Sequence, residues 1–578
     1  MLVGSALSVV GTDEVTETEA FEVSDGSYAV VLDQAVVPYS GTDVTIEARN
    51  SQGKELFLGT ANGVDTDSFL DGVSQVQISD VDFPDQATHR SLPGDPAPAA
   101  DIAGRDWWTS RETGQSVAKT FDLDADPQML VIAPAAEGEN LDGTTVQLKM
   151  RVEGVLALSL IGLAVAIIFA GFSAYFFLRW WNARIRPRRK KGGPSTRADE
   201  SGDGTRGKKP SRMAAAVKGR SKPDAAPESK PDSKPETQPG ADDAPASDGE
   251  PPRRRSRRGA RTLAATAVTL TTGLALSGCA AIPVAQPHTP NVTPYERTAV
   301  RPGEAGDFMT GYTESLDKIL ADKGEGLESI QGAPLIDRTR AQIQIAEKTK
   351  QTLRAPNFTE VVAGGPSFEQ YPMWFYALGT TDGDEKLTQV QLATRESAST
   401  QPIVRSAVFI PADQAPTLLA DQNGAVEVAP KAFSESMTTA ADEVASYLAD
   451  GKADKVKGLD QGGFKSFRDY LGGLRNEDSG FDEVTAECKP YSEFDFASMT
   501  LTTEQGALGM GEVRCTLTIK VPEDYSLDLG DTIEAVKTND KDGNTVKVDT
   551  AQPYVIMQNG EELTAVASDW DILSSRIE

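Results

Sequence analysis

One uninterrupted apolar run limits what this chain can fold into more than any other feature. Residues Val155 to Leu178 comprise 24 residues without a charged side chain. At about 1.5 Å per residue, a helix of this length crosses the roughly 30 Å hydrocarbon core of a bilayer. A buried core helix is the alternative, but so long and uniformly apolar a run is typical of a membrane span. We therefore predict a transmembrane helix within residues 153–179.

The charges beside this run indicate its orientation. The sequence RWWNARIRPRRKK follows it, with tryptophans suited to the membrane interface and a basic cluster that favours the cytoplasm. We therefore expect residues 20–152 outside the cytoplasm and residues 180–258 inside it. Residues 1–19 lack the basic start of a signal peptide but resemble the end of one. We interpret them as the remnant of a signal or membrane segment whose true start lies upstream.

The expected cytoplasmic segment, residues 180–258, is basic and rich in proline. Between Arg179 and Arg261 there are 23 Lys/Arg and 11 Asp/Glu residues, a local charge of +12 in a chain of net charge -29. It holds almost no apolar side chains whose burial could offset the entropy of folding. We predict a disordered linker. A spacer is the simpler interpretation, and a tail that binds a partner or anionic lipid is the alternative.

A second export signal follows at residues 259–284. The basic stretch RRRSRRGAR precedes the mildly apolar LAATAVTLTTGLAL and then LSGC. This order resembles the lipobox of bacterial lipoproteins, which implies a diacylglyceryl group on Cys279 and cleavage before it. The alternative is an uncleaved second membrane helix at residues 263–284. Either version carries residues 285–578 back to the outer face, beginning with a proline-rich tether at 285–305.

Residues 20–152 are expected to form an all-β sandwich. Short runs of alternating apolar and polar residues are separated by Gly, Asp and Pro clusters, with one short helix at DTDSFLDGV. The series LFLGTANGVDTDSFLDGV, RDWWTSRETG and PQMLVIAPAAEG resembles the ectodomain of actinobacterial membrane proteins of unknown function. That resemblance implies no activity. The pair Trp107–Trp108 is either core packing or a platform on which a ligand stacks.

Residues 306–578 repeat one order of elements, helices followed by strands. In the first unit, residues 306–428, Phe308, Tyr312, Leu316 and Ile319 share a helix face, and Asp382-Gly383 indicates a hairpin. The second unit, residues 429–578, begins with a helix at about 431–448. Its expected strands include DTIEAVKTN and AVASDWDIL, with a hairpin at Asp542-Gly543. Each unit resembles the cystatin-like α+β roll of the nuclear transport factor two group, so tandem rolls are expected.

The cysteines of the second unit indicate a disulfide. Apart from Cys279, the chain has only Cys488 and Cys515, and both lie in expected strands of an exported domain. Export places them in an oxidising environment, where a structural disulfide is the natural interpretation. A reactive thiol is the alternative.

Catalytic and metal-binding chemistry has little support in the sequence. The chain has two histidines, His89 and His288, which disfavours His-based zinc sites and Ser-His-Asp or Cys-His catalysis. The spacing of Asp122, Asp124 and Asp126 suggests calcium. However, an EF-hand loop needs Gly and Glu where this chain has Pro127 and Ala133. We therefore expect no metal and no cofactor. The net charge also disfavours a nucleic-acid partner.

Together these features predict a non-catalytic protein of the bacterial plasma membrane. Its domains outside the cytoplasm would bind a partner protein, an envelope lipid or glycan, or each other. The alternative is an enzyme that acts on an envelope polymer with Asp and Glu carboxylates alone.

Overall fold

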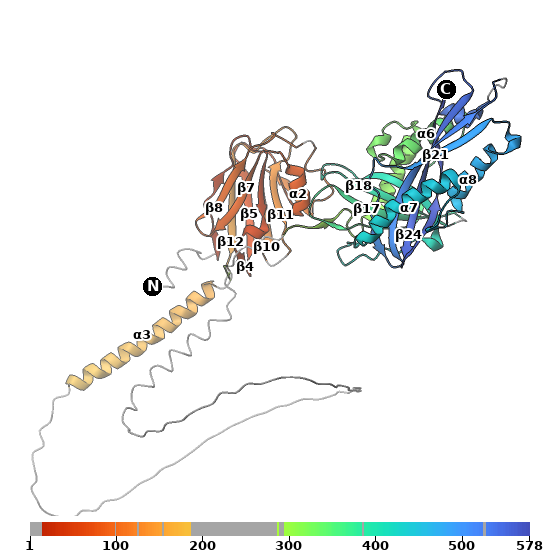
Figure 1. Ribbon diagram of the computed structural model, residues 1–578. Coiled ribbons are helices and arrows are strands. Elements are labelled where there is room, and N and C mark those ends of the chain that lie inside the picture. The colour runs from red at the N-terminus through yellow and green to blue at the C-terminus, as the bar shows by residue number, and fades with distance from the viewer. Residues whose placement is uncertain are drawn as a thin grey trace, which may run out of the picture. The chain divides into compact units, whose positions relative to one another are not determined.

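The computed structural model describes residues 14–98, 100–123, 126–152, 155–185, 286–287, 294–383, 386–523 and 528–578. The chain divides into two compact units, Met1–Leu163 with Pro283–Glu578, and Ala164–Ile282. The first unit is multidomain and rich in β-sheet (Figure 1). Cys279, most of the expected linker and the second export signal lie outside the described residues.

The amino-terminal domain contains two sheets that pack face to face, as a sandwich requires. The smaller sheet has the order β1 (Val15–Glu17), β12 (Thr144–Arg151), β5 (Asp43–Asn50), β10 (Ser116–Asp122), and β2 (Phe21–Glu22) also pairs with β12. The larger sheet has the order β8 (Gln86–Leu92), β7 (Gln75–Asp82), β3 (Ala29–Asp33), β11 (Met129–Pro134), β6 (Leu56–Ala61), β9 (Ser110–Gly114). The predicted boundary at residue 20 is too late, because β1 pairs with β12.

The pattern of apolar residues along each strand explains which faces of the two sheets are buried. Strand β5 alternates, and its Val44, Ile46 and Ala48 face the core between the sheets. The central strands β3, β6 and β11 are instead buried along their whole length. A strand that is covered on both faces has a continuous apolar sequence. The second face of the larger sheet is covered by α2 (Gly63–Leu70) and by Trp107 and Trp108, so these tryptophans are core residues.

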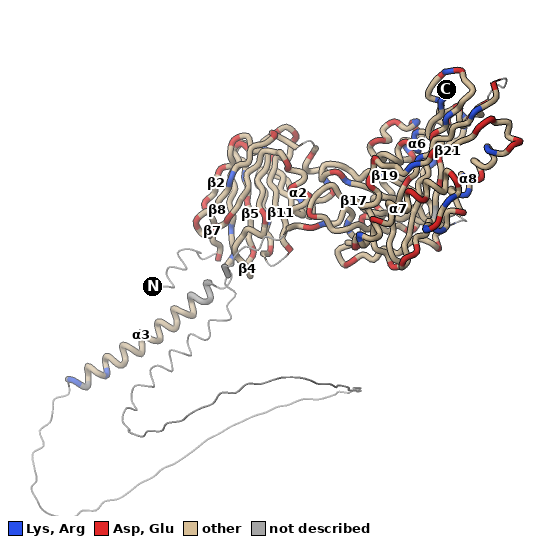
Figure 2. The backbone as a smooth tube through the Cα atoms, in the orientation of Figure 1, with Lys and Arg blue, Asp and Glu red and all other residues tan. Residues whose placement is uncertain are grey.

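Helix α3 (Val155–Ile185) contains the apolar run. Residues Leu160–Asn182 are long and apolar enough to cross a membrane, and the described side chains along this segment are exposed. Figure 2 shows α3 almost free of charge until basic residues appear toward its carboxyl end, where Arg179 and Arg184 lie. Large exposed side chains such as Phe169 require an apolar environment, which agrees with the predicted membrane span.

Helices followed by a sheet occur twice in the carboxy-terminal half, as expected. The first set has α5 (Ala305–Ala321), α6 (Leu335–Thr349) and a sheet of order β15 (Phe358–Gly364), β17 (Met373–Thr381), β18 (Leu387–Arg395), β19 (Ile403–Pro411). The second has α7 (Lys431–Asp450), α8 (Gly462–Leu474) and a sheet of order β20 (Val456–Lys457), β25 (Glu562–Ser568), β24 (Thr545–Asn559), β23 (Gly506–Lys520), β21 (Glu483–Pro490). Strands β22 (Leu501–Thr503) and β26 (Asp571–Ile577) pair with β23 and β24.

These two sets share a core, so they are not independent units. Trp374 and Tyr376 of β17 pack in one apolar cluster with Leu508 and Met510 of β23. Helix α6 also contacts β26 of the second set. There the buried Arg338 donates to Asp571 across 2.8 Å, with side chains only 5% and 11% exposed. The division at residue 428 therefore separates elements, not folding units.

Three local predictions in the second set are wrong. DTIEAVKTN forms the short helix α9 (Gly530–Ala535), whose Ile533 packs on the core. AVASDWDIL is divided between β25 and β26, which pair with the two halves of the long strand β24. The chain turns between them because Trp570 leaves the sheet and packs against Phe467 and Tyr470. Asp542-Gly543 lies in the connection before β24 and does not form a tight hairpin.

Candidate functional site: the interface between the domains

The expected tether at residues 285–305 is wrong for its described residues from 294 onward. Residues 297–300 are buried, and β14 (Arg297–Thr298) pairs with β16 (Ser367–Phe368). They pack against the amino-terminal domain because an arginine and a tyrosine here find acidic partners on that domain. This segment and the loop after β18 form the interface between the two halves of the chain.

A buried ion pair lies at the centre of the first contact. Arg297 pairs with Asp65 of α2, with side chains only 6% and 2% exposed. Tyr371 donates its hydroxyl to the other carboxylate oxygen of Asp65 at 2.6 Å, and Arg297 Nε donates to the carbonyl of Thr298 at 2.9 Å. A buried charge is tolerated only when its polar atoms are partnered. Burial and then the Asp65 carboxylate raise the pKa of Tyr371, so this hydroxyl remains a donor.

The start of α2 receives the same segment. Asn62 caps α2 by accepting from the amide of Val64, and its Nδ2 donates to the carbonyl of Glu296 at 2.9 Å. Tyr295 donates to Asp33 at 2.5 Å, and its ring lies where any side chain at Gly63 would clash. Glycine at position 63 therefore allows the second half of the chain to approach the backbone of α2 closely.

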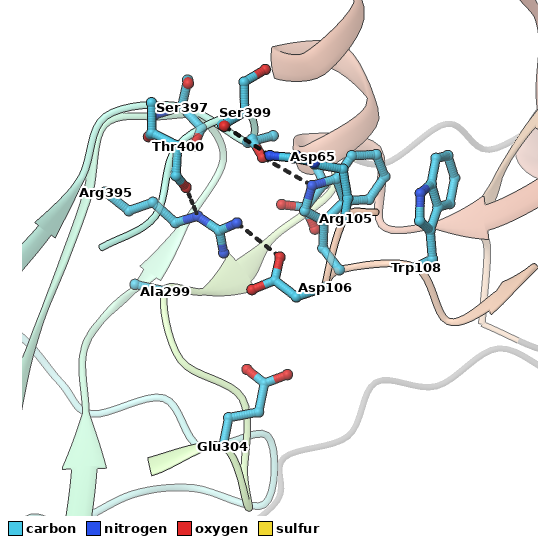
Figure 3. Close-up of polar contacts among 12 residues, drawn as sticks. Asp65, Arg105, Asp106, Trp108, Ala299, Glu304, Arg395, Ser397, Ser399 and Thr400 are labelled. Carbon is cyan, nitrogen blue, oxygen red and sulfur yellow. Dashed lines mark hydrogen bonds and ion pairs between the residues drawn. The ribbon is translucent and has the colours of Figure 1, made fainter. Parts of the chain in front are cut away.

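A second contact joins residues 101–108 to the loop after β18 (Figure 3). Arg395 donates to Asp106 at 3.0 Å and to the carbonyl of Thr400 at 2.9 Å. From the other side, Arg105 donates to the carbonyl of Ser399 at 3.0 Å, as Figure 3 shows. The Trp107 indole donates to the carbonyl of Ala398 at 3.0 Å. Three side-chain donors thus fix one short loop.

The pKa of Asp106 reflects its position at the edge of this contact. Burial would raise its pKa, but the Arg395 guanidinium, through its charge and its hydrogen bond, leaves the pKa below the ordinary value. The Asp106 side chain is 53% exposed, whereas that of Arg395 is 4% exposed. Asp106 therefore neutralises a buried cation from the rim, where protons can reach it.

Each domain also contributes an apolar side chain to the core of the other. Val64 of α2 belongs to the cluster formed by Ala299, Val300 and Met309. Ala398 belongs to the cluster formed by Trp107 and Phe69 in the amino-terminal domain. The interface thus combines apolar burial with partnered polar groups, which is the composition of a specific protein–protein contact.

The predicted site residues lie elsewhere. Cys488 and Cys515 stand opposite each other on β21 and β23 and form the predicted disulfide. Cys279 lies outside the described residues, as does Asp124 of the aspartate series at residues 122–126. Among the residues that the structure describes, no group of three His, Cys, Asp or Glu side chains could hold a metal ion.

Sequence reasoning missed the residues that form the interface. Asp65 and Arg297 are 232 positions apart, so no local pattern links them. One signal was available in the sequence YERTAV. It contains a tyrosine and an arginine and ends in apolar residues, a composition that is unusual for a solvated tether.

No known protein family, curated protein or solved structure matches the chain.

A cavity of about 240 Å³ lies beside α7 and β23. Its lining includes Met437, Phe494, Met510 and Tyr554, so it is largely apolar, and Glu512 also borders it. Glu512 Oε1 accepts from Arg514 at 2.5 Å, and burial raises the pKa of Glu512.

Proposed function

We propose that this chain is a non-catalytic, membrane-tethered protein of the bacterial cell envelope. Its two domains outside the cytoplasm act as one body that binds a partner protein, a lipid or a glycan. The buried interface between the amino-terminal domain and residues 294–578 is the observation that carries this proposal. Domains that share buried contacts must lie on the same side of the membrane.

That requirement supports a second membrane crossing. Helix α3 alone would leave the two domains on opposite sides, so residues 259–284 have to return the chain. In this topology α3 crosses from outside to inside, as its basic carboxyl end favours.

Both ends of the intervening chain reach the same edge of the amino-terminal domain. Strand β13 (Gln286–Pro287) pairs with β4 (Tyr39–Ser40). Two residues beyond β4, the Thr42 hydroxyl donates to the carbonyl of Arg151, the last residue of β12 before α3. The chain therefore leaves and re-enters this domain beside one strand, which is the arrangement expected of two neighbouring membrane segments.

The same geometry supports lipidation of Cys279. Cys279 and Gln286 are seven positions apart, and a fully extended chain over that distance reaches at most about 25 Å. A lipid on Cys279 would thus enter the membrane close to the place where α3 enters it. Two acyl chains are sufficient for stable anchoring.

We further propose that the carboxy-terminal half consists of two cystatin-like rolls and that the amino-terminal domain is a β-sandwich. The order of helices and strands, and α7 packed against β21 and β23, support the rolls. The apolar cavity beside α7 is where a roll of this kind would hold a ligand. The largely apolar lining of this cavity supports ligand binding over hydrolysis by two carboxylates.

Site-specific proteolysis tests the topology. An identical protease site is inserted after Gly240 in one version and after Pro290 in the other. We expect protease added to intact spheroplasts to cut only at Pro290, and to cut at Gly240 after the membrane is permeabilised. Cleavage at Gly240 in sealed spheroplasts would contradict the proposal.

Crosslinking in intact cells tests the binding function. Crosslinked protein is recovered from membranes and its partners are identified by mass spectrometry, with Met437→Trp as a variant that fills the cavity. A lipid or glycan lost from this variant supports binding in the roll, and a retained protein partner supports binding elsewhere on the body. Turnover of an envelope polymer by the purified protein would favour the enzyme.

A further inference from the structure

We propose that the two halves of the chain are each other's binding partners and stay associated without a covalent connection. The chain would then work as a complex of two subunits, residues 14–152 with α3 and residues 286–578, even after the connecting segment has been cut. This inference depends on the interface alone and not on the ligand of the proposed function.

The interface has the reciprocal character of contacts between subunits. Val64 enters the core of the carboxy-terminal half, and Ala398 enters that of the amino-terminal domain. Separation would expose both cores to water, and the loss of apolar burial opposes it. A flexible connection between independent domains would not require such exchange.

The polar contacts make the association specific. Asp65 receives Arg297 and Tyr371, while Ala398 and Ser399 supply carbonyls to Trp107 and Arg105. The polar contacts come from three stretches of the first domain and three of the second, and these stretches are separate in sequence. Their donors and acceptors match in position, so a non-cognate surface would leave buried groups unpartnered.

The path of the chain shows that the connection is not needed to position the halves. The pairing of β13 with β4 begins where the described chain resumes at residue 286, and the contacts of Tyr295 begin where it resumes again at residue 294. The interface itself thus determines how the halves meet, and cleavage before Gln286 would remove none of these contacts. A product cut before Cys279 would retain them all.

Cleavage of the full-length protein tests the inference. Protease sites are inserted after Glu153 and before Gln286, the protein is purified in detergent, and both sites are cut to release the folded body from its membrane segments. We expect the two fragments to co-elute in a 1:1 ratio during size-exclusion chromatography, also after dilution to nanomolar concentration. Separate elution of the fragments, folded or aggregated, would overturn the proposal.

A matched pair of variants separates association from folding. Arg105→Ala removes a donor to Ser399 of the other half, whereas Arg111→Ala removes a similar donor to Ala103 within the same domain. A hydrogen bond from a charged donor contributes enough for about a tenfold change in the dissociation constant. We expect Arg105→Ala to weaken association by about that factor and Arg111→Ala to leave it unchanged. Equal effects of both variants, or none from Arg105→Ala, would overturn the proposal.

Discussion

At the scale of single residues, Arg297 and Asp65 matter most because their charges are buried together. We predict that Arg297→Met lowers the free energy of unfolding of the released body by about 3–5 kcal/mol, since Asp65 is then left buried without its cationic partner. Urea unfolding measures this loss. Adding Asp65→Asn should recover much of it, because the uncompensated charge is then gone.

Arg49 provides the control for this prediction. It pairs with Glu47 on the surface, with side chains 69% and 25% exposed. Exposed pairs contribute at most about 1 kcal/mol, so Arg49→Met should change the unfolding free energy by less than that. A similar loss in both variants would show that burial of the Asp65 pair is not the cause.

Asp106 should make the association of the two halves depend on pH. Its pKa is lower in the folded protein than in the unfolded chain, so its stabilising effect is full above the ordinary value of 3.8 and is lost as pH falls through the lower folded value. We predict that the dissociation constant of the cleaved halves rises in that acidic range. The Asp106→Asn variant should have a higher dissociation constant at neutral pH, and that constant should change less with pH. Dissociation constants measured between pH 3 and 7 check this. Parallel pH profiles for both proteins would contradict it.

At the scale of elements, the sequence pattern predicted helices and strands well where the burial of side chains follows the period of the sequence. The apolar runs of β17 and β19 and the amphipathic face of α7 end close to where their patterns end. Pattern failed where tertiary contacts decide, as when Trp570 packs on α8 and divides one expected strand into β25 and β26. Local pattern could not predict the interface, because only the fold brings Arg297 to Asp65.

The disulfide should stabilise the edge strand β21 and with it the second sheet. It joins cysteines 27 positions apart, and closing a loop of that length constrains the unfolded chain by about 3 kcal/mol in the chain-entropy model. We predict that reductant lowers the unfolding free energy of the released body by about this amount. The variant with Cys488→Ser and Cys515→Ser should be equally weakened and insensitive to reductant. An unchanged urea midpoint on reduction of the wild-type protein would contradict this.

At the scale of the whole molecule, the interface connects topology to processing. The two domains share a buried interface, the described chain leaves and returns beside strand β4, and a sequence resembling a lipobox precedes the return. A membrane subunit and a lipoprotein subunit within one precursor would show all three features. A single tethered polypeptide requires the first two and gives no reason for the third.

Mass spectrometry of the protein purified from membranes distinguishes these two forms. We predict two chains, the second beginning at a lipid-modified Cys279, which elute together because residues 294–301 and the loop after β18 hold the amino-terminal domain. Cys279→Ser should give one uncut chain with the same interface, and therefore unchanged thermal unfolding of the body. The uncut segment, with its four threonines in LAATAVTLTT, is a poor membrane anchor, so the variant should depend on α3 for retention in the membrane. A single unlipidated 61.6 kDa species in the wild type would refute processing while leaving the interface intact.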